Sequence, residues 1–337
     1  MPPGGAVSYG IDVGGTKILG VALGADGKAL AEHELATPQS AIVPAIAPPH
    51  DEAGEQPPGD AAEQVADAIA AVARRVGWSF GPVGVGMPGM VDSTGVVRFS
   101  PNLPGAHGVD MQALVAARLP GAGVVVANDA DCGATAELRV GAARGVLEGL
   151  VVTLGTGIGG SVISSGKVQR GAHGFAGEVG HMVVEHAGPM CACGRRGCWE
   201  RYASGGGLGR LAREAALAGT LHKVVEMAGG DPELVRGEHV SLAAAGGDEG
   251  ALRVMEELGW WVAMGLANLV AVLDPELIVV GGGLAEVGEL VLAPARRSLA
   301  SLVEGGRARP DIPIVPAQLG RRAGAVGAAL LVHPAWG

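Results

Sequence analysis

Three cysteines and a histidine are spaced closely enough in this sequence to hold a metal ion. The cysteines fall within eight residues, and the histidine precedes the first of them by ten residues. Zinc prefers thiolate and imidazole ligands and binds four of them in a tetrahedron. His173 and His186 are less well placed to be the fourth ligand than the histidine nearest the cluster. The sequence therefore predicts a zinc site made of His181, Cys191, Cys193 and Cys198.

A zinc ion held by four protein side chains has no open coordination position, so it would shape the chain rather than do chemistry. Two carboxylates, Glu178 and Glu200, flank the cluster. A solvated surface carboxylate is the commoner situation for either side chain alone. A metal that folds this segment would fix both acids beside His181, where paired carboxylates can accept the vicinal hydroxyls of a sugar.

Two glycine-rich turns, each between apolar segments, could bind phosphate groups. Backbone N–H groups in such turns approach anionic oxygens, threonine and lysine add donors, and an aspartate can hold Mg²⁺ through water. The first is neither a Walker A loop nor a dinucleotide-binding turn, because no helix follows it. Two such turns could clamp a polyphosphate, and a pair of ordinary hairpins is the alternative. The candidate residues are Asp12, Gly14, Gly15, Thr16 and Lys17 in the first turn, and Gly155, Thr156 and Gly157 in the second, which we expect to extend to Gly160.

Asn128 and Asp129 stand where an apolar strand should end and a helix should begin. Both residue types favour the helix N-cap, which is one interpretation. The other is that Asp129 accepts the proton of a substrate hydroxyl while Asn128 orients the substrate. A helix N-terminus stabilises the anion and makes it a weak base, which phosphoryl transfer tolerates. Asn102 is either a turn residue or a further polar contact, and Cys132 is expected to be a small buried residue.

Strands alternate with helices along the chain, and this alternation predicts an α/β fold. Glycine or polar residues follow several of the strands, at the ends where α/β folds bind ligands. A proline-rich segment, Thr37 to Gly59, is expected to be a surface loop that leads into a capping box at Asp60 and Glu63. The helix that follows should bury Val65, Ile69, Val72 and Val76 on one face and end at Gly77. The other expected elements are strands at Val7–Val13, Ile18–Leu23, Val83–Val85, Val124–Val126, Leu150–Leu154, Ser161–Ile163 and Leu277–Val280, and a helix at Ala251–Leu273.

The bulk composition excludes several classes of protein. A net charge of -10 argues against a nucleic-acid partner. The longest apolar run, Leu258 to Leu273, is shorter than a bilayer span and contains Asn268, so we expect a buried helix and no membrane partner. No signal peptide is recognisable at the N-terminus. Clustered cysteines suit a reducing compartment better than a disulfide framework, so the cytoplasm is expected.

Taken together, these motifs resemble the ROK family of bacterial sugar kinases and repressors, from Tyr9 to about Leu331. The likeness is closest to the ATP-dependent glucokinases of that family. It rests on Asp12-Val-Gly-Gly-Thr-Lys17, Asn128-Asp129, Leu154-Gly-Thr-Gly-Ile-Gly-Gly160, Gly177-Glu178-Val-Gly-His181, Cys191-Ala-Cys193-Gly-Arg-Arg-Gly-Cys198-Trp-Glu200, and Asp274-Pro275 leading to Gly281-Gly-Gly283.

The resemblance implies an actin-like (ribonuclease H-like) ATPase fold with two α/β lobes around a cleft. We expect an N-terminal lobe at 1–127, with a C-terminal helix in 320–337 packing back on it, and a larger lobe at 128–319 that carries the zinc loop 181–198. The implied reaction is transfer of phosphate from ATP, with Mg²⁺, to the 6-hydroxyl of glucose, with Asp129 as catalytic base and the zinc structural. The resemblance further implies sugar contacts from Gly89, Asn102, Asn128, Glu178, His181 and Glu200, and a nucleotide contact from Gly282 and Gly283.

The sequence leaves alternative substrates and alternative functions open. Another hexose or an N-acetylhexosamine could be the acceptor, and polyphosphate could be the donor. Glucokinases of the family commonly carry a tryptophan where Ala106-His107 stand here, which bears on sugar preference. A sugar-responsive transcriptional regulator is a rival from another class; only eight residues precede Tyr9, so we do not expect a DNA-binding domain there. A zinc-stapled interaction module without catalysis is another rival. The family suggests a homodimer or homotetramer, and the sequence does not choose between them.

Overall fold

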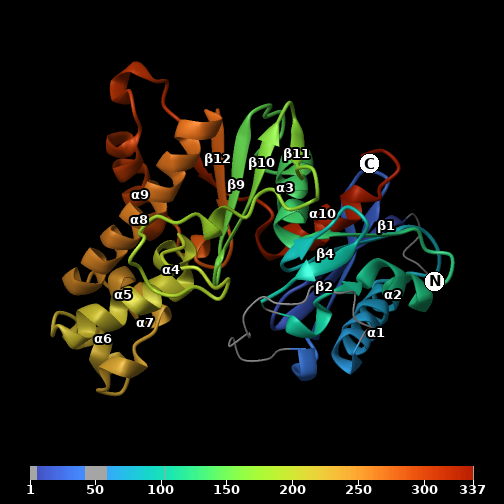
Figure 1. The fold of residues 1–337 in the computed structure, drawn as a ribbon, viewed down its shortest axis with the longest axis horizontal. Coiled ribbons are helices and arrows are strands. Elements are labelled where there is room, and N and C mark those ends of the chain that lie inside the picture. Colours follow the sequence, from blue (N-terminus) through green and yellow to red (C-terminus); the bar gives the residue numbers. More distant parts are fainter. Residues whose placement is uncertain (1–5, 42–58, 102, 337) are drawn as a thin grey trace. The chain divides into compact units, whose positions relative to one another are not determined.

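The computed structural model describes residues 6–41, 59–101 and 103–336. Contacts divide the chain into two units, whose helices and strands are labelled in Figure 1. Unit 1 comprises Met1–Gly145, Gly166–Gly177 and Arg321–Gly337, and unit 2 comprises Val146–Ser165 and Glu178–Gly320. The expected boundary between residues 127 and 128 falls just before a helix that packs in unit 1. Arg321–Gly337 belongs to unit 1.

Unit 1 is built on a five-stranded sheet in which three parallel strands end at the same edge. The strand order is β3-β2-β1-β4-β8, with β1 antiparallel to β2 and parallel to β4, and β4 parallel to β8. The strands are β1 (Ala6–Val13), β2 (Lys17–Gly24), β3 (Ala29–Ala36), β4 (Val83–Met87) and β8 (Val124–Asn128). A smaller sheet contains β5 (Met90–Val91), β6 (Val96–Phe99) and β7 (Val109–Asp110), and the unit's later segment carries β11 (Lys167–Gln169).

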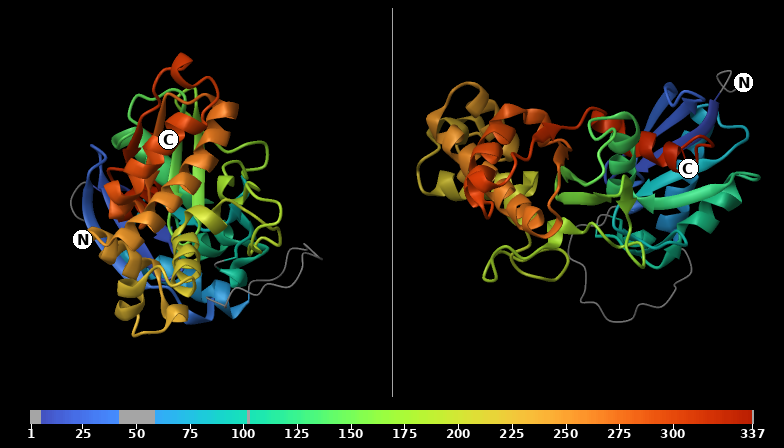
Figure 2. Two further views of the ribbon diagram at one scale, coloured as in Figure 1. Left: turned by 90° about the vertical axis from the view of Figure 1, so that its left-hand side faces the viewer. Right: turned by 90° about the horizontal axis from the view of Figure 1, so that it is seen from above.

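Apolar side chains at helical spacing fix the helices of unit 1 to this sheet. Helix α1 (Asp60–Arg75) buries the predicted face of Val65, Ile69 and Val72, and Val76 is buried directly after it. The predicted capping box is wrong: Gly59 is the N-cap and Asp60 the first helical residue, so no side chain caps this helix. The remaining helices are α2 (Met111–Arg118), α3 (Asp129–Val140) and α10 (Ala323–Leu331). Helix α10, near the C-terminus marked in Figures 1 and 2, packs against β1, β4 and α3.

Unit 2 carries its own sheet and most of the helical residues of the chain. Within this unit β10 pairs antiparallel with β9, while β9, β12 and β13 run parallel. The strands are β9 (Gly149–Leu154), β10 (Ile158–Ser164), β12 (Leu277–Gly281) and β13 (Ile314–Pro316). The helices are α4 (Glu200–Ala203), α5 (Gly205–Leu217), α6 (His222–Met227), α7 (Gly237–Ala245), α8 (Glu249–Leu273) and α9 (Glu289–Leu302).

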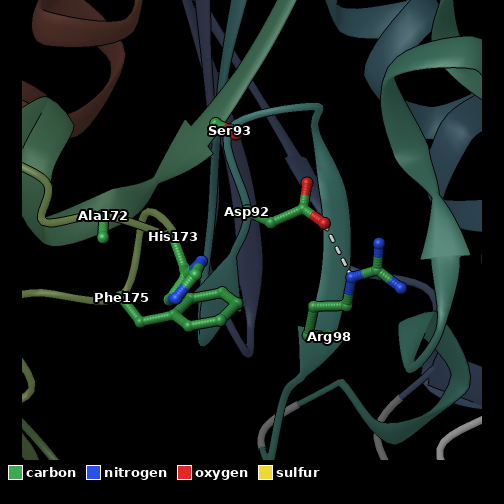
Figure 3. Close-up of a pocket in the computed structure, with 6 residues that line it drawn as sticks. All are labelled: Asp92, Ser93, Arg98, Ala172, His173 and Phe175. Atoms are coloured by element: carbon green, nitrogen blue, oxygen red, sulfur yellow. Dashed lines mark hydrogen bonds and ion pairs between the residues drawn. The ribbon is translucent and has the colours of Figure 1, made fainter.

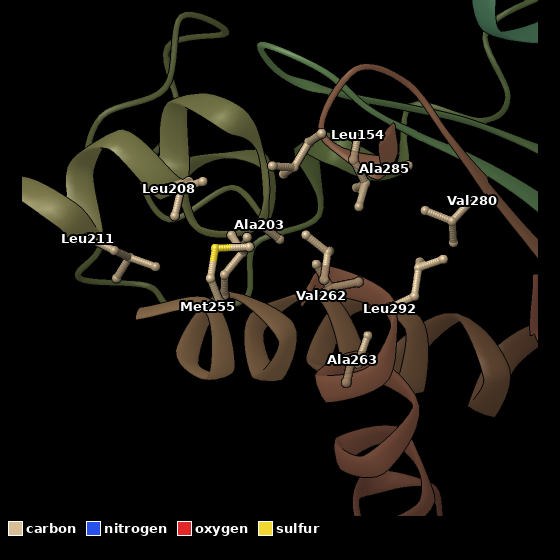
Figure 4. Close-up of a cluster of buried hydrophobic side chains, with 14 of the residues drawn as sticks. Leu154, Ala203, Leu208, Leu211, Met255, Val262, Ala263, Val280, Ala285 and Leu292 are labelled. Atoms are coloured by element: carbon tan, nitrogen blue, oxygen red, sulfur yellow. The ribbon is translucent and has the colours of Figure 1, made fainter. Parts of the chain in front are cut away.

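The long helix α8 runs through the core of unit 2. Figure 4 shows Met255, Val262 and Ala263 of α8 among side chains from β9, β12, α5 and α9. Among the described residues α8 is the one helix long and apolar enough, by length and composition alone, to cross a membrane, and half of its most apolar 18-residue window is buried. Its burial in the core agrees with the prediction of a buried helix that stops before Asp274 and Pro275.

Short 3-10 helices complete the described part of the chain. They are η1 (Gln39–Ala41), η2 (Pro104–Ala106), η3 (Val179–His181), η4 (Pro232–Leu234), η5 (Ala285–Val287), η6 (Gly306–Ala308) and η7 (Gly320–Arg322). Most of the proline-rich segment predicted as a loop, residues 42–58, lies outside the described residues.

Candidate active site

Two aspartates of unit 1 lie at the carboxyl ends of two parallel strands, β1 and β8, which flank β4 in the sheet. Asp12 is paired with Gly86 between β1 and β4, and Asp129 directly follows β8. A Cβ atom built on Gly86 would lie 3.3 Å from Oδ1 of Asp12 and 3.5 Å from Cα of Asp129, so Gly86 separates the two residues. The edge of the sheet therefore brings together the aspartate of the first glycine turn and the predicted base, which are far apart in sequence.

Burial at this edge changes the acidity of both carboxyl groups. Burial raises the pKa of Asp12 to about 7. Burial, and next the charge of Asp12, raise the pKa of Asp129 to about 7, although the backbone N–H of Ala130 donates to Oδ1 of Asp129 at 2.8 Å and opposes the shift. A carboxyl group with a pKa near neutrality can take up and release a proton at physiological pH, as a general base must.

Asn128 caps helix α3 and also contacts a neighbouring loop. Its side-chain oxygen accepts the backbone N–H of Asp131 at 3.0 Å, and its amide nitrogen donates to the carbonyl of Gly89 at 2.9 Å. The capping interpretation is therefore correct, and it leaves Asp129 as the first helical residue, where the helix dipole stabilises a negative charge. Asp131 is buried and forms an ion pair with Arg170 at 3.5 Å, an interaction that the sequence did not suggest.

The first glycine turn is a tight connection between β1 and β2. The Gly14 N–H donates to the carbonyl of Lys17 at 2.9 Å, and the hydroxyl of Thr37 donates to the carbonyl of Gly14 at 2.7 Å. Lys17 is the first residue of β2, and its ammonium group lies 3.1 Å from Oε2 of Glu34. This ion pair is partly exposed, with 45% and 39% of the two side chains accessible, so it leaves the lysine able to turn towards a phosphate group.

Sequence reasoning missed one close contact at this edge. A Cβ atom built on Gly324, in the first turn of α10, would lie 2.6 Å from each carboxylate oxygen of Asp12. The Asp12 carboxylate therefore occupies space that any side chain at residue 324 would fill. Sequence separation hid this contact, and a glycine within a short apolar helix was its only local sign.

The four predicted metal ligands of unit 2 converge. One ligand atom from each of them lies within 4.8 Å of the others. Cys191 Sγ is 3.6 Å from His181 Nδ1, and Cys193 Sγ is 3.5 Å from Cys198 Sγ. Tetrahedral zinc with these ligands has edges of about 3.5–3.8 Å, so the donor set and its spacing fit the ion. This geometry favours His181 over the alternative histidines, because His186 is almost fully exposed on a surface loop.

Both flanking glutamates lie at this cluster. Glu178 Oε2 is 3.8 Å from Nε2 of His181, and Glu200 Oε1 is 3.7 Å from Nδ1 of the same ring. If Nδ1 binds the metal, Nε2 is left facing Glu178. Two carboxylates and one imidazole nitrogen therefore lie together beside the Cys3His cluster, where a bound metal would fix them.

The second glycine turn, in unit 2, is shorter than predicted. Strand β10 begins at Ile158, so only Gly155 to Gly157 form the turn, while Gly159 and Gly160 pair with β9. Gly282 packs against this connection: a Cβ atom there would lie 2.5 Å from the carbonyl oxygen of Leu154. The predicted phosphate turn and the glycines after β12 are therefore neighbours within unit 2.

Of the remaining predicted residues, one is not described and one lies away from these clusters. Asn102 is outside the described residues. His173 lines a separate cavity in unit 1 of about 440 Å³ (Figure 3). Arg98 and Asp92 form an ion pair at 2.6 Å on one side of it, and His173 and Phe175 lie on the other. The residues around this cavity are Asp92, Ser93, Arg98, Ala172, His173 and Phe175, and none of them was predicted as a site residue except His173, as an alternative metal ligand.

Comparison with known proteins places this arrangement in a family. The sequence matches the ROK family over residues 8–335. It is 38% identical over 332 residues to the glucokinase of Streptomyces coelicolor, covering 97% of this chain and 98% of that protein. The crystal structure of a ROK family glucokinase from Streptomyces griseus in complex with glucose and AMPPNP superposes with a TM-score of 0.81 at 37% identity, covering 97% of this chain and 99% of that one. A ROK hexokinase from Thermus thermophilus gives a TM-score of 0.71 at 32% identity, with 96% and 97% covered.

An α/β protein with two glycine turns, an aspartate directly after a sheet strand and a Cys3His cluster is thus similar to sugar kinases throughout its length. The chain belongs to the ROK family. The predicted α/β fold of the actin-like ATPase class is confirmed by these structural neighbours.

Proposed function

We propose that this protein is an ATP-dependent glucokinase, which transfers the γ-phosphoryl group of ATP to the 6-hydroxyl of glucose. The observation that carries the proposal is Asp129, a partly buried carboxyl group at the first residue of a helix, whose pKa burial raises to about 7. The relatives named glucokinase, and the solved glucokinase that holds glucose and AMPPNP, support the substrates.

In the proposed reaction Asp129 takes the proton from the 6-hydroxyl as that oxygen bonds to the γ-phosphorus. The bond between the γ-phosphorus and the bridging oxygen breaks, and ADP leaves with the electron pair. Because the transition state of phosphoryl transfer is loose, the chain contributes mainly positioning and charge stabilisation. The Asn128 cap fixes Asp129 by holding the start of α3, while the contact of Asn128 with Gly89 ties that start to the loop after β4.

Asp12 is the residue we assign to Mg²⁺. Two partly buried carboxyl groups with raised pKa values at one sheet edge form an oxygen-rich site that a divalent cation would stabilise in the ionised form. The ion, when bound, neutralises the developing charge on the phosphates. Asp12 would hold it through water, Gly324 leaves Asp12 its place, and the exposed Lys17 and Thr16 of the adjacent turn would donate to phosphate oxygens.

In unit 2 we assign sugar recognition to Glu178, His181 and Glu200, and we add Asn128, Gly89 and Asn102 from unit 1. Carboxylates and an imidazole accept hydroxyl protons well, and the metal cluster fixes all three of the unit 2 side chains. Zinc in this cluster would be structural, because the Cys3His set leaves no ligand position open. The nucleotide contacts that we assign in unit 2 are Gly155, Thr156, Gly157, Gly282 and Gly283.

We further propose that the enzyme works in the cytoplasm as a homo-oligomer, without a nucleic-acid or membrane partner. The net charge of -10 supports the proposal that the protein has no nucleic-acid partner. A gel-shift assay with random duplex DNA at low salt, with and without glucose, tests it against the rival regulatory role. Light scattering gives the oligomeric state.

An assay of ADP release tests the function directly. The purified protein is supplied with ATP and Mg²⁺ and, in parallel, with glucose, mannose, fructose, N-acetylglucosamine or N-acetylmannosamine; polyphosphate replaces ATP in a second series. We expect the highest kcat/KM with ATP and glucose. Asp129→Asn should lower kcat by about 10²–10⁴-fold, as the loss of a general base does, while glucose still binds. Turnover of Asp129→Asn within a few-fold of wild type removes the assignment of the base, and no ADP release with any sugar removes the kinase proposal.

A further inference from the structure

Glu200 lies between the metal cluster and the second glycine turn of unit 2. Its Oε1 is 2.9 Å from Sγ of Cys191. Its other oxygen, Oε2, accepts the backbone N–H of Ile158 at 3.4 Å. A Cβ atom built on Gly157 would lie 2.5 Å from the same oxygen. One carboxylate therefore contacts both the cluster assigned to sugar binding and the turn assigned to phosphate binding.

Backbone contacts join the same two places a second time. Ser204 ends helix α4, and its hydroxyl donates to the carbonyl of Glu200 at 2.6 Å. The same hydroxyl accepts the N–H of Gly207 and so caps helix α5. The next residue, Gly205, donates its N–H to the carbonyl of Gly155 at 2.7 Å. Gly206 also donates its N–H to the carbonyl of Thr156 at 3.3 Å. The corner between α4 and α5 thus bonds to the backbone of Glu200 through one hydrogen bond and to the glycine turn through two.

Helix α4 is packed firmly against the core of unit 2. The corner between α4 and α5 therefore cannot move independently of that core. Trp199, directly before Glu200, is fully buried, and its indole N–H donates to the carbonyl of Trp261 in α8 at 2.7 Å. Gly265 of α8 passes so close to the indole ring that a Cβ atom there would overlap it. Because a close-packed core deforms little, a displacement of the Glu200 carboxylate is passed to the glycine turn rather than absorbed by α4.

We propose that Glu200 and Ser204 couple the two substrate sites within unit 2, so that glucose and nucleotide each increase the affinity for the other. This inference rests on the proposed function, since it assigns glucose to Glu200 and phosphate to the turn. Sugar hydroxyls that fix the Glu200 carboxylate also fix Oε2 against the Ile158 N–H and Gly157, which orders the turn before the nucleotide arrives. By thermodynamic linkage the nucleotide raises glucose affinity by the same factor.

Isothermal titration calorimetry of glucose, without nucleotide and with saturating AMPPNP and Mg²⁺, measures the coupling in the wild type. We expect a ratio of dissociation constants of roughly 5–20, within the usual range for coupled sites. Gly157→Ala is the decisive variant, because its new methyl group is directed at the Glu200 carboxylate. It should weaken glucose binding at least about tenfold with no nucleotide present, although residue 157 is not assigned to the sugar.

Gly155→Ala is the matched control, because a Cβ atom at residue 155 meets nothing within 4 Å. It alters the same turn, and its nucleotide affinity is free to change, but its glucose affinity without nucleotide should stay within twofold of wild type. Ser204→Ala, which keeps every assigned contact side chain, should bring the coupling ratio close to one. Metal content and melting temperature are recorded for each variant, so that loss of the cluster is distinguished from loss of coupling.

Two results would overturn the inference. One is a Gly157→Ala protein that retains its metal and binds glucose as the wild type does. The other, which decides the matter if Gly157→Ala does not fold, is a Ser204→Ala protein with an unchanged coupling ratio. Either result leaves the kinase assignment standing if wild-type turnover with glucose is normal. Absence of turnover with every sugar in the wild type instead contradicts the proposed function itself.

Discussion

Gly324 and Asp12 come from opposite ends of the chain, and they are in contact because residue 324 has no side chain. A Cβ atom there would lie 2.6 Å from both oxygens of the Asp12 carboxylate. The first turn of α10 therefore limits the positions available to the Asp12 carboxylate, which we assign to Mg²⁺.

Gly324→Ala should displace Asp12 and lower kcat by roughly 10²-fold, because small misplacements at a reacting centre have effects of this size. The Mg²⁺ concentration for half-maximal rate should rise, while glucose binding in calorimetry is unchanged. Gly133→Ala on the facing helix α3 is the control: its Cβ atom would meet only Ala323, at an ordinary 3.9 Å. That variant should keep its activity and gain about 0.5–1 kcal/mol of stability from the better helix former. Equal activity of the two variants would disprove the positional role of Gly324.

Asp129→Asn should make the protein more stable, and by an amount that depends on pH. The folded pKa of Asp129 is raised to about 7 from the ordinary 3.8, so ionising it disfavours the folded state. The neutral carboxyl favours folding fully below the unfolded pKa, and this advantage is lost as pH rises towards 7. The stability difference between the Asp129→Asn variant and wild type should therefore grow by at most about 1.4 kcal/mol per pH unit from pH 4 to 7, and level off above 7. Urea unfolding at pH 5, 6, 7 and 8 measures it, and a difference independent of pH contradicts the assigned pKa.

The charge of Asp12 should be visible in the pH profile of the enzyme. After burial, Asp12 is the main cause that raises the pKa of Asp129, and Asp131 is a weaker one. A base must be ionised to accept a proton, so kcat/KM for glucose should rise with pH through the pKa of Asp129 in the free enzyme. Asp12→Asn should move this rise to lower pH, in addition to lowering the rate. Asp131→Asn should shift the rise of kcat/KM to lower pH by a smaller amount. A larger shift for Asp131→Asn than for Asp12→Asn would contradict the ranking of the two charges.

Removal of the metal should unfold the segment that carries Glu178 and Glu200. Cys193→Ser should lose the bound zinc, measured by mass spectrometry of the metal, and should cost on the order of 4 kcal/mol of stability together with most of the glucose affinity. The control is Cys132→Ala, which removes the fourth cysteine, a buried residue of unit 1. It should cost about 1–2 kcal/mol as a small cavity and keep the metal. If zinc is lost from Cys193→Ser while KM and melting temperature hold, the cluster does not shape the sugar site.

Local patterns predicted the elements of this fold well, because their causes are local. The strand that ends at Asn128, the cap at that residue and the buried face of α1 all follow from neighbouring residues. The ligand spacing of the metal cluster was equally readable, since its three cysteines lie in one loop.

Errors and omissions arose where a distant partner decides the outcome. The second glycine turn was predicted too long, because Gly159 and Gly160 accept extended backbone when β9 lies opposite them. The residue type makes Asp60 the expected helix cap, but the backbone conformation places the cap at Gly59. Two contacts depend on how separate elements pack together: Glu200 with Gly157, and Gly324 with Asp12. The sequence around each residue does not specify this packing.

Helix α10 follows the whole of unit 2 along the chain, yet it packs on β1, the first strand of unit 1. During synthesis on the ribosome the N-terminal sheet therefore emerges without the helix that packs on β1 and β4, and it lacks this helix while more than half of the chain is still to be made. Unit 2 (apart from its own first hairpin) is a continuous segment and can fold in the meantime. Asp12 acquires its final surroundings only when Gly324 docks, so the nascent chain cannot assemble its phosphate edge, or consume ATP, before translation of both units is complete.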